Sequence, residues 1–365
     1  MQFKHIIRSR KFIRRTIVGI ALLAVAIAVI NIVGTKLTRI IEALRPPQLA
    51  DIPVPTKRYW LRNQQNWNDA LSQEFHHKSQ GTRTLPVPLS WFLALEEPQS
   101  GVMATLLGGE NEPFARDEYL LRFGFIQGEK SDHNPHGLPV GFAITPAQSF
   151  IGVNDQQSAI GFTCAACHTG HLTYEGTEYV VEGGPATTDL GLLTEALGTA
   201  LGQTLVSAKI PFGGGRFERF AKHVLGDGYS GDTRDVLQKE VEVVVNSLAA
   251  LPTTIEVIEG YTRLDALNRI GNQVFAWDPL RGENYVAINA PVNYPHIWTS
   301  SWFNWVQYDG SIMEPLVRNA GEALGVSAFL NTTAPLDQQR FASSVNIRNL
   351  VWIEKSLSGD APWPL

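Results

Sequence analysis

The sequence contains only two cysteines among its 365 residues, and this number excludes a small scaffold held together by several disulfides. The chain is 44% apolar and 18% charged, so it is not a disordered tail and can bury a large core. No internal repeat is visible, which excludes a solenoid or a propeller. The composition therefore predicts a globular protein with one large domain or two of ordinary size.

Basic residues are missing from a long central part of the chain, because no Lys or Arg occurs between Ser131 and Ala208. Residues 1–45 carry nine of the 30 basic residues and one of the 35 acidic ones, so the remaining chain has a net charge of −13. Binding to nucleic acid relies on Lys and Arg contacts to phosphate, and we expect no nucleic-acid partner. An acidic body instead favours a partner protein with a basic face.

A long apolar run is found near the N-terminus. Six basic residues between Lys4 and Arg15 precede the apolar segment Ile17–Val33. These 17 residues span ~26 Å as a helix, close to the ~30 Å hydrocarbon core of a bilayer, which predicts a transmembrane anchor at residues 16–34. The basic residues 1–15 would stay in the cytoplasm, so we expect a single-pass inner-membrane protein whose body faces the periplasm. A cleaved signal peptide is the alternative.

The remaining chain divides into a linker and a body. Residues 35–57 contain four prolines and are typical of a stiff, extended spacer. In the body, residues 58–365, helical periodicity occurs at residues 190–201, 216–225, 236–248, 253–275 and 346–357, whereas strand signals are limited to 178–181 and 285–288. We therefore predict a mainly α body with long irregular loops.

Both cysteines lie in one short string, Cys164-Ala-Ala-Cys167-His168. A C-x-x-C-H string is the attachment motif of c-type haem. Two thiols three positions apart lie on one helical turn, so each can form a thioether bond with one vinyl group of the same porphyrin. His168 is then placed to bind the iron as the proximal ligand. The string predicts one covalent haem c on a cytochrome c-like domain, with His168 as the metal ligand.

Three other uses of the two cysteines remain open. A C-x-x-C redox pair would leave the adjacent His168 unexplained. A zinc site could add a histidine and His171, but ligands packed into eight residues have little freedom to form a tetrahedron. A structural disulfide is the third use. Haem attachment is the interpretation that employs the whole string.

The string does not define the sixth ligand of the iron. A Met or His in that position suits electron transfer, whereas an open position lets peroxide or dioxygen bind. The candidates are Met103, Met313, His76, His77, His133, His136, His171, His223 and His296. His171 lies three positions after His168, so it cannot reach the opposite face of the porphyrin.

Trp302 and Arg318 are further candidate contacts of the haem. Trp298, Trp302 and Trp305 recur at helical spacing, which is typical of core packing, and the alternative is a wall of aromatic rings over the haem. Arg318 could donate two hydrogen bonds to a haem propionate, or it could pair with Glu322.

Several blocks of the sequence resemble the exported di-haem c-type cytochromes, the family of bacterial cytochrome c peroxidase and the rubber oxygenases. The blocks are His77–Thr82 with Leu85–Glu96, Gly161–His168, Tyr294–Gln307, Arg318–Gly325, and Asn346–Leu350 with Pro362–Pro364. The resemblance covers most of residues 59–365 and corresponds to the N-terminal haem portion of the family. It implies a mostly helical fold, a haem on Cys164, Cys167 and His168, and oxidoreductase or electron-transfer activity. The family pattern continues into a second C-x-x-C-H domain, which this chain does not contain.

These features predict a membrane-anchored periplasmic c-type cytochrome with one haem. It would carry out electron transfer, or peroxidase- or oxygenase-type chemistry, together with a basic-faced redox partner. The alternative is a haem-stabilised structural or docking subunit that pairs with a separate haem domain. The expected site residues are Cys164, Cys167, His168, Trp302 and Arg318.

Overall fold

The structure is a computed structural model that describes residues 44–61, 67–101, 109–150, 152–209, 215–250, 255–307 and 309–358. The predicted anchor, residues 16–34, and the basic segment before it lie outside these ranges. Within them, no helix combines the length and the apolar character needed to cross a bilayer. The described residues therefore do not support the predicted single-pass location in the inner membrane with a periplasmic body.

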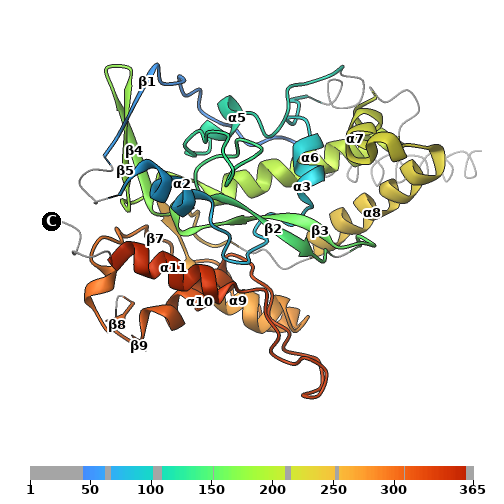
Figure 1. Cartoon of the computed structure of the whole chain (residues 1–365). Helices are drawn as coiled ribbons and strands as arrows, with labels where there is room; N and C mark the ends of the chain where they lie inside the picture. Colours follow the sequence, from blue (N-terminus) through green and yellow to red (C-terminus); the bar gives the residue numbers. More distant parts are fainter. Residues whose placement is uncertain are drawn as a thin grey trace, which may run out of the picture.

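The body is a mixed α/β structure, so the prediction of a mainly α fold was wrong (Figure 1). The α-helices are α2 (Asp69–His77), α3 (Leu89–Ala94), α5 (Asp117–Leu121), α6 (Leu190–Lys209), α7 (Arg216–Leu225), α8 (Gly231–Ala250), α9 (Ala266–Asn272), α10 (Pro315–Gly325) and α11 (Ile347–Ser358). The strands are β1 (Lys57–Trp60), β2 (Phe142–Gln148), β3 (Gln157–Phe162), β4 (Thr169–Tyr174), β5 (Thr177–Glu182), β6 (Arg263–Leu264), β7 (Val292–Asn293), β8 (Trp305–Val306) and β9 (Ile312–Met313). Short helical turns include η2 (Cys164–Ala166), η4 (Gln273–Trp277) and η6 (Ser300–Trp302).

Several helices lie where the periodicity predicted them. The helix at α7 has the predicted bounds, and α6 begins after Asp189, whose carboxylate accepts a hydrogen bond from the Leu192 amide at 3.0 Å. The predicted helix at residues 253–275 is helical only from Ala266 onward among the described residues. The predicted strand at 285–288 is reduced to one bridge between Ile288 and Ile255.

Two antiparallel hairpins enclose the cysteine string. The hairpin β2–β3 ends just before Cys164, and Phe142 faces Phe162 across it with ring centroids 5.0 Å apart. The strand β4 starts directly after His168 and pairs with β5, to which β1 adds in parallel to give the order β1-β5-β4. The motif therefore forms the connection between two sheets, which a helical prediction could not anticipate.

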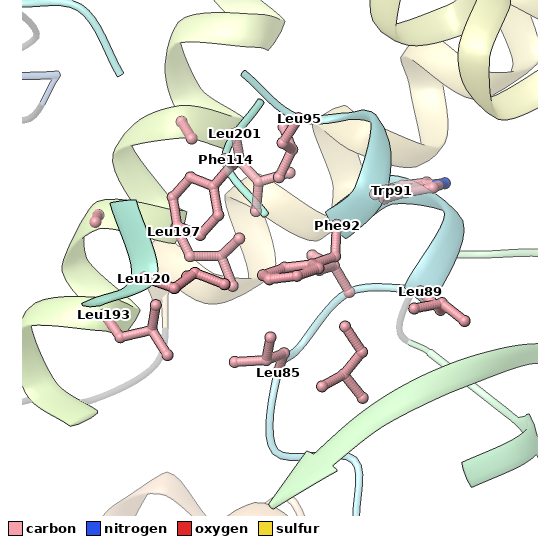
Figure 2. Close-up of a cluster of buried hydrophobic side chains, with 14 of the residues drawn as sticks. Leu85, Leu89, Trp91, Phe92, Leu95, Phe114, Leu120, Leu193, Leu197 and Leu201 are labelled. Atoms are coloured by element: carbon pink, nitrogen blue, oxygen red, sulfur yellow. The ribbon is translucent and has the colours of Figure 1, made fainter. Parts of the chain in front are cut away.

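The buried apolar side chains form two clusters. The larger cluster is built mainly from α3, α6, α7, α8 and the β2–β3 hairpin, and Figure 2 shows Phe92, Phe114 and Leu197 gathered between α3 and α6. The smaller cluster joins α2, β5 and α11. In Figure 1, α6 runs through the middle of the molecule, with α7 and α8 on one side and the β1-β5-β4 sheet on the other.

Replacement of Gly141 tests how tightly the cysteine turn is packed. Gly141 has φ +91°, and a Cβ atom there would overlap the backbone of Ala166. We expect Gly141→Ala to lower the free energy of unfolding by about 1–3 kcal/mol or more, through overpacking and backbone strain. Denaturant unfolding measures this change.

The matched control is Gly198→Ala on α6, where an added Cβ meets no atom within 4 Å. This control should be neutral or stabilising by about 0.5–1 kcal/mol, because alanine favours helix. Equal stability of the two variants would contradict the packing described for the turn.

Candidate functional site

The cysteine string folds as one tight turn because Thr163 caps it. The Thr163 hydroxyl oxygen accepts a hydrogen bond from the Ala165 amide at 3.2 Å and donates to the His76 carbonyl at 3.1 Å. The His168 amide then donates to the Cys164 carbonyl at 2.9 Å and closes the turn. A side-chain cap of this kind satisfies amides that the first turn leaves unpaired.

The turn lies at the junction of the two apolar clusters. Ala166 belongs to the larger cluster and Ala165 to the smaller one, and both are nearly inaccessible to solvent. Cys167 packs against the first cluster and Cys164 against the second. The two alanines between the cysteines are therefore enclosed by protein on both sides of the turn.

The two cysteines are free thiols with part of their surface accessible. Burial raises the pKa of Cys164, an effect partly opposed by the positive charge of Arg318 and by the Gln80 side-chain amide, which donates to Sγ at 3.0 Å. Burial also raises the pKa of Cys167 to about 12. Redox-active C-x-x-C pairs depend on a lowered thiol pKa, so the environment opposes that use of the string.

The imidazole of His168 is oriented by a residue 127 positions away. Its Nδ1 lies 2.7 Å from the carbonyl oxygen of Pro295. Burial lowers the pKa of His168 to about 4, although the Pro295 contact opposes this shift. The ring is therefore neutral at pH 7, and its single proton must be on Nδ1, since a carbonyl only accepts.

This tautomer leaves Nε2 of His168 with a lone pair, and no residue in the described ranges hydrogen-bonds to it. Neutral histidines that bind metals usually donate their other ring N–H to a backbone carbonyl or a carboxylate in this way. His168 thus has the hydrogen-bond arrangement that is common among metal-binding histidines.

Arg318 on α10 is close enough to shift the pKa values of both Cys164 and His168. Its Nη1 lies 3.6 Å from Glu322 Oε1, so the ion pair considered from the sequence is present. Its Nε is buried and has no hydrogen-bond partner among the described residues. A buried, unpaired donor beside the turn is unfavourable by itself and is suited to an anionic group bound there.

Trp302 is 44% exposed on the short turn η6, which packs against α11. The predicted helical stripe is absent: Trp305 lies in β8, and Trp298 lies before η6, where its Nε1 donates to the Glu182 carbonyl at 2.8 Å. The helical spacing was therefore coincidental in this segment.

Several of the candidate sixth ligands have other partners. His76 pairs with Glu182 at 2.9 Å and His171 with Glu178 at 2.7 Å. Met313 is 60% exposed, and Met103 lies outside the described residues.

Within the described ranges, no group of three or more His, Cys, Asp or Glu side chains could hold a metal ion. This finding contradicts the zinc alternative, in which Cys164, Cys167, His171 and a further histidine would bind the metal, and it gives no support to metal binding by side chains alone.

Sequence reasoning missed three residues at the site. Gln80 contacts Cys164, Pro295 orients His168, and Tyr294 places its hydroxyl near Cys167, where it opposes a small part of the rise in the pKa of that thiol. All three lie within the blocks that carried the family resemblance, but a linear sequence gives no sign that these blocks meet around the turn.

Comparisons with known proteins add one relative. The chain is 46% identical over 329 residues to the uncharacterized protein y4iJ of Sinorhizobium fredii, and this match covers 86% of the chain. It covers 52% of y4iJ, so the chain spans about half the length of this relative. No protein-family model matches, and no solved structure matches. The resemblance to di-haem cytochromes is therefore carried by the sequence blocks alone.

The reactivity of the thiols tests their environment. A rise in the pKa of Cys167 from 9.0 to about 12 reduces the thiolate fraction near pH 8 about a thousandfold, and Cys164 should change in the same direction. In the haem-free protein we therefore expect slow alkylation by iodoacetamide, with a rate that continues to rise above pH 10. Mass spectrometry resolves the two sites. The unfolded protein is the control, and equal rates in the folded and unfolded states would contradict the described burial.

Proposed function

We propose that the chain is a c-type cytochrome that binds one haem covalently through Cys164 and Cys167, with His168 as the proximal ligand. The observation that carries this proposal is the hydrogen bond from His168 to Pro295, which leaves the Nε2 lone pair available beside two thiols on one turn. A porphyrin brings four nitrogen ligands of its own, so one imidazole from the chain is sufficient.

The residues present fit such a group in three respects. The thiols are neutral and partly accessible, the imidazole is neutral with its ring fixed, and Arg318 offers the unpaired Nε donor to a propionate carboxylate. When bound, haem supplies an iron that exchanges electrons and, with an open sixth position, can bind peroxide or dioxygen. The chain's own part is to hold the group, orient the imidazole and set the charge around it.

The activity proposed is electron transfer or peroxidase- or oxygenase-type oxidation. A redox partner with a basic face is part of this proposal, because the segment 131–208 that surrounds the turn carries no Lys or Arg.

A second candidate is a haem-stabilised docking subunit. It is favoured by an exposed apolar surface within residues 302–317, formed by Trp302, Phe303, Trp305, Met313 and Val317, which are 44–60% exposed. Exposed aromatic groups of this kind mark interaction sites, and y4iJ is about twice as long as the matched segment. Peroxide-dependent turnover by the isolated haem-loaded chain would oppose this second candidate.

Haem attachment is tested by expression in a bacterial host that matures c-type cytochromes. We expect the purified chain to have the mass of the polypeptide plus one haem and the absorption spectrum of a haem with two thioether bonds. The control is the double variant Cys164→Ser with Cys167→Ser, which should have the bare mass. A bare mass for the unaltered chain, in cells that load a reference cytochrome, would overturn the proposal.

Arg318 is tested by Arg318→Gln in the haem-loaded protein. Loss of a positive charge near the iron stabilises the ferric state, so the reduction potential should fall, and haem should remain attached through the thioethers. The control is Arg281→Gln, whose side chain is 67% exposed and pairs with Glu283. A potential that is the same in both variants and in the unaltered protein would exclude Arg318 from the site.

A further inference from the structure

A buried ionisable pair lies outside the site described above. Nε2 of His76, on α2, is 2.9 Å from Oε1 of Glu182, at the end of β5, and the two side chains are 1% and 0% exposed. The hydroxyl of Ser72 donates a hydrogen bond to the same carboxylate oxygen. Burial of such groups is unfavourable unless they are paired, and a broken pair leaves an uncompensated buried charge. The pair therefore fixes the end of α2 against the end of β5.

On the Glu182 side, the pair is connected to the segment that contains Pro295, whose carbonyl orients His168. The Glu182 carbonyl accepts a hydrogen bond from Nε1 of Trp298 at 2.8 Å, and the next carbonyl, that of Gly183, accepts from the Ile297 amide at 2.9 Å. Both donors lie within three residues of Pro295. Glu182 also faces Thr169, the residue after His168, across the β4–β5 ladder.

The His76 end supports the turn that carries the cysteines. The His76 carbonyl accepts hydrogen bonds from the Thr163 hydroxyl at 3.1 Å and from the Gly141 amide at 3.2 Å. Thr163 caps the turn, and Gly141 packs against it. The pair thus connects the two parts of the chain that hold His168. One is the cysteine turn, which carries His168, and the other is the segment that contains Pro295, whose carbonyl orients the imidazole ring.

We propose that Glu182 and His76 are positioning residues that hold the His168 imidazole in the orientation required of a haem ligand. This inference rests on the proposed function. The strength of the bond from Nδ1–H to the Pro295 carbonyl sets how strongly the imidazole donates electrons through Nε2, and hence which oxidation state of a bound iron is favoured.

The test compares Glu182→Gln with Glu178→Gln in the haem-loaded chain. Glu178 lies on the same face of β5, has a 1% exposed side chain and pairs with His171, but it is at the opposite end of the strand from Pro295. We expect Glu182→Gln to raise the reduction potential and lower the iron–histidine stretching frequency in resonance Raman spectra, because a loosened bond makes the imidazole a weaker donor. Glu178→Gln should leave both near the values of the unaltered protein.

A milder variant tests the same connection in case Glu182→Gln does not fold. Trp298→Phe removes the indole N–H that binds the Glu182 carbonyl but keeps an aromatic ring, so it should shift both readouts in the same direction by less. The inference would be overturned if neither Glu182→Gln nor Trp298→Phe changed the reduction potential or the stretching frequency. It would also be overturned if Glu178→Gln changed them as much as Glu182→Gln.

Amide hydrogen exchange in the haem-free protein separates this inference from the proposed function. The Ile297 amide should exchange faster in Glu182→Gln than in Glu178→Gln, because its segment is released. Absence of haem from the unaltered chain would count against the proposed function alone, whereas equal Ile297 exchange in the two variants would count against the positioning role.

Discussion

The hydrogen bond from His168 to the Pro295 carbonyl is the contact on which the site depends. It joins two segments that are 127 residues apart, and it is made at a point where the chain passes from one sheet to the next. The bond fixes the tautomer as well as the orientation of the ring, since the carbonyl cannot donate. Without it, the imidazole could bind protons or metals through either nitrogen and would have no preferred direction.

Small residues and close packing make this bond possible. Ala165 and Ala166 allow the turn to lie between two apolar clusters, and Gly141 lets the β2–β3 hairpin approach its backbone. The cluster contacts fix the turn, while the Pro295 segment is held separately through the end of β5. Orientation of His168 therefore requires that two parts of the chain far apart in the sequence meet correctly.

The sequence predicted the parts of this structure that depend on local pattern. The helices α6, α7 and α11 follow the apolar periodicity of their own residues, and the cysteine string forms the single helical turn that its spacing predicted. The β4–β5 hairpin was recognised only in part, because its short strands carry buried charges such as Glu178 and Glu182 in place of apolar residues. The fold class was mistaken for this reason, together with the glycines and prolines that resembled loop.

The tryptophan segment shows the opposite failure, in which a local pattern is present but has no structural counterpart. Three indoles at helical spacing fall on a loop, a short turn and a strand, because the segment is shaped by contacts with β5 and α11 that lie far away in the sequence. Nor could the contacts that define the site, from Gln80, Pro295 and Arg318, be derived from spacing. Each is made between segments separated by more than 80 residues.

Burial governs the charge state of the three titratable groups at the turn, Cys164, Cys167 and His168. Burial raises the pKa of both thiols and lowers that of the imidazole, so the protein environment favours the neutral form of each. A thiolate formed there would be poorly solvated, whereas a thioether carries no charge and loses nothing on burial. A neutral imidazole is likewise the form that binds iron, because its lone pair is available. Desolvation of the turn therefore disfavours thiol exchange, which needs a thiolate, but does not disfavour a permanent thioether bond to a porphyrin. In this respect the packing of the turn agrees with the function proposed for it.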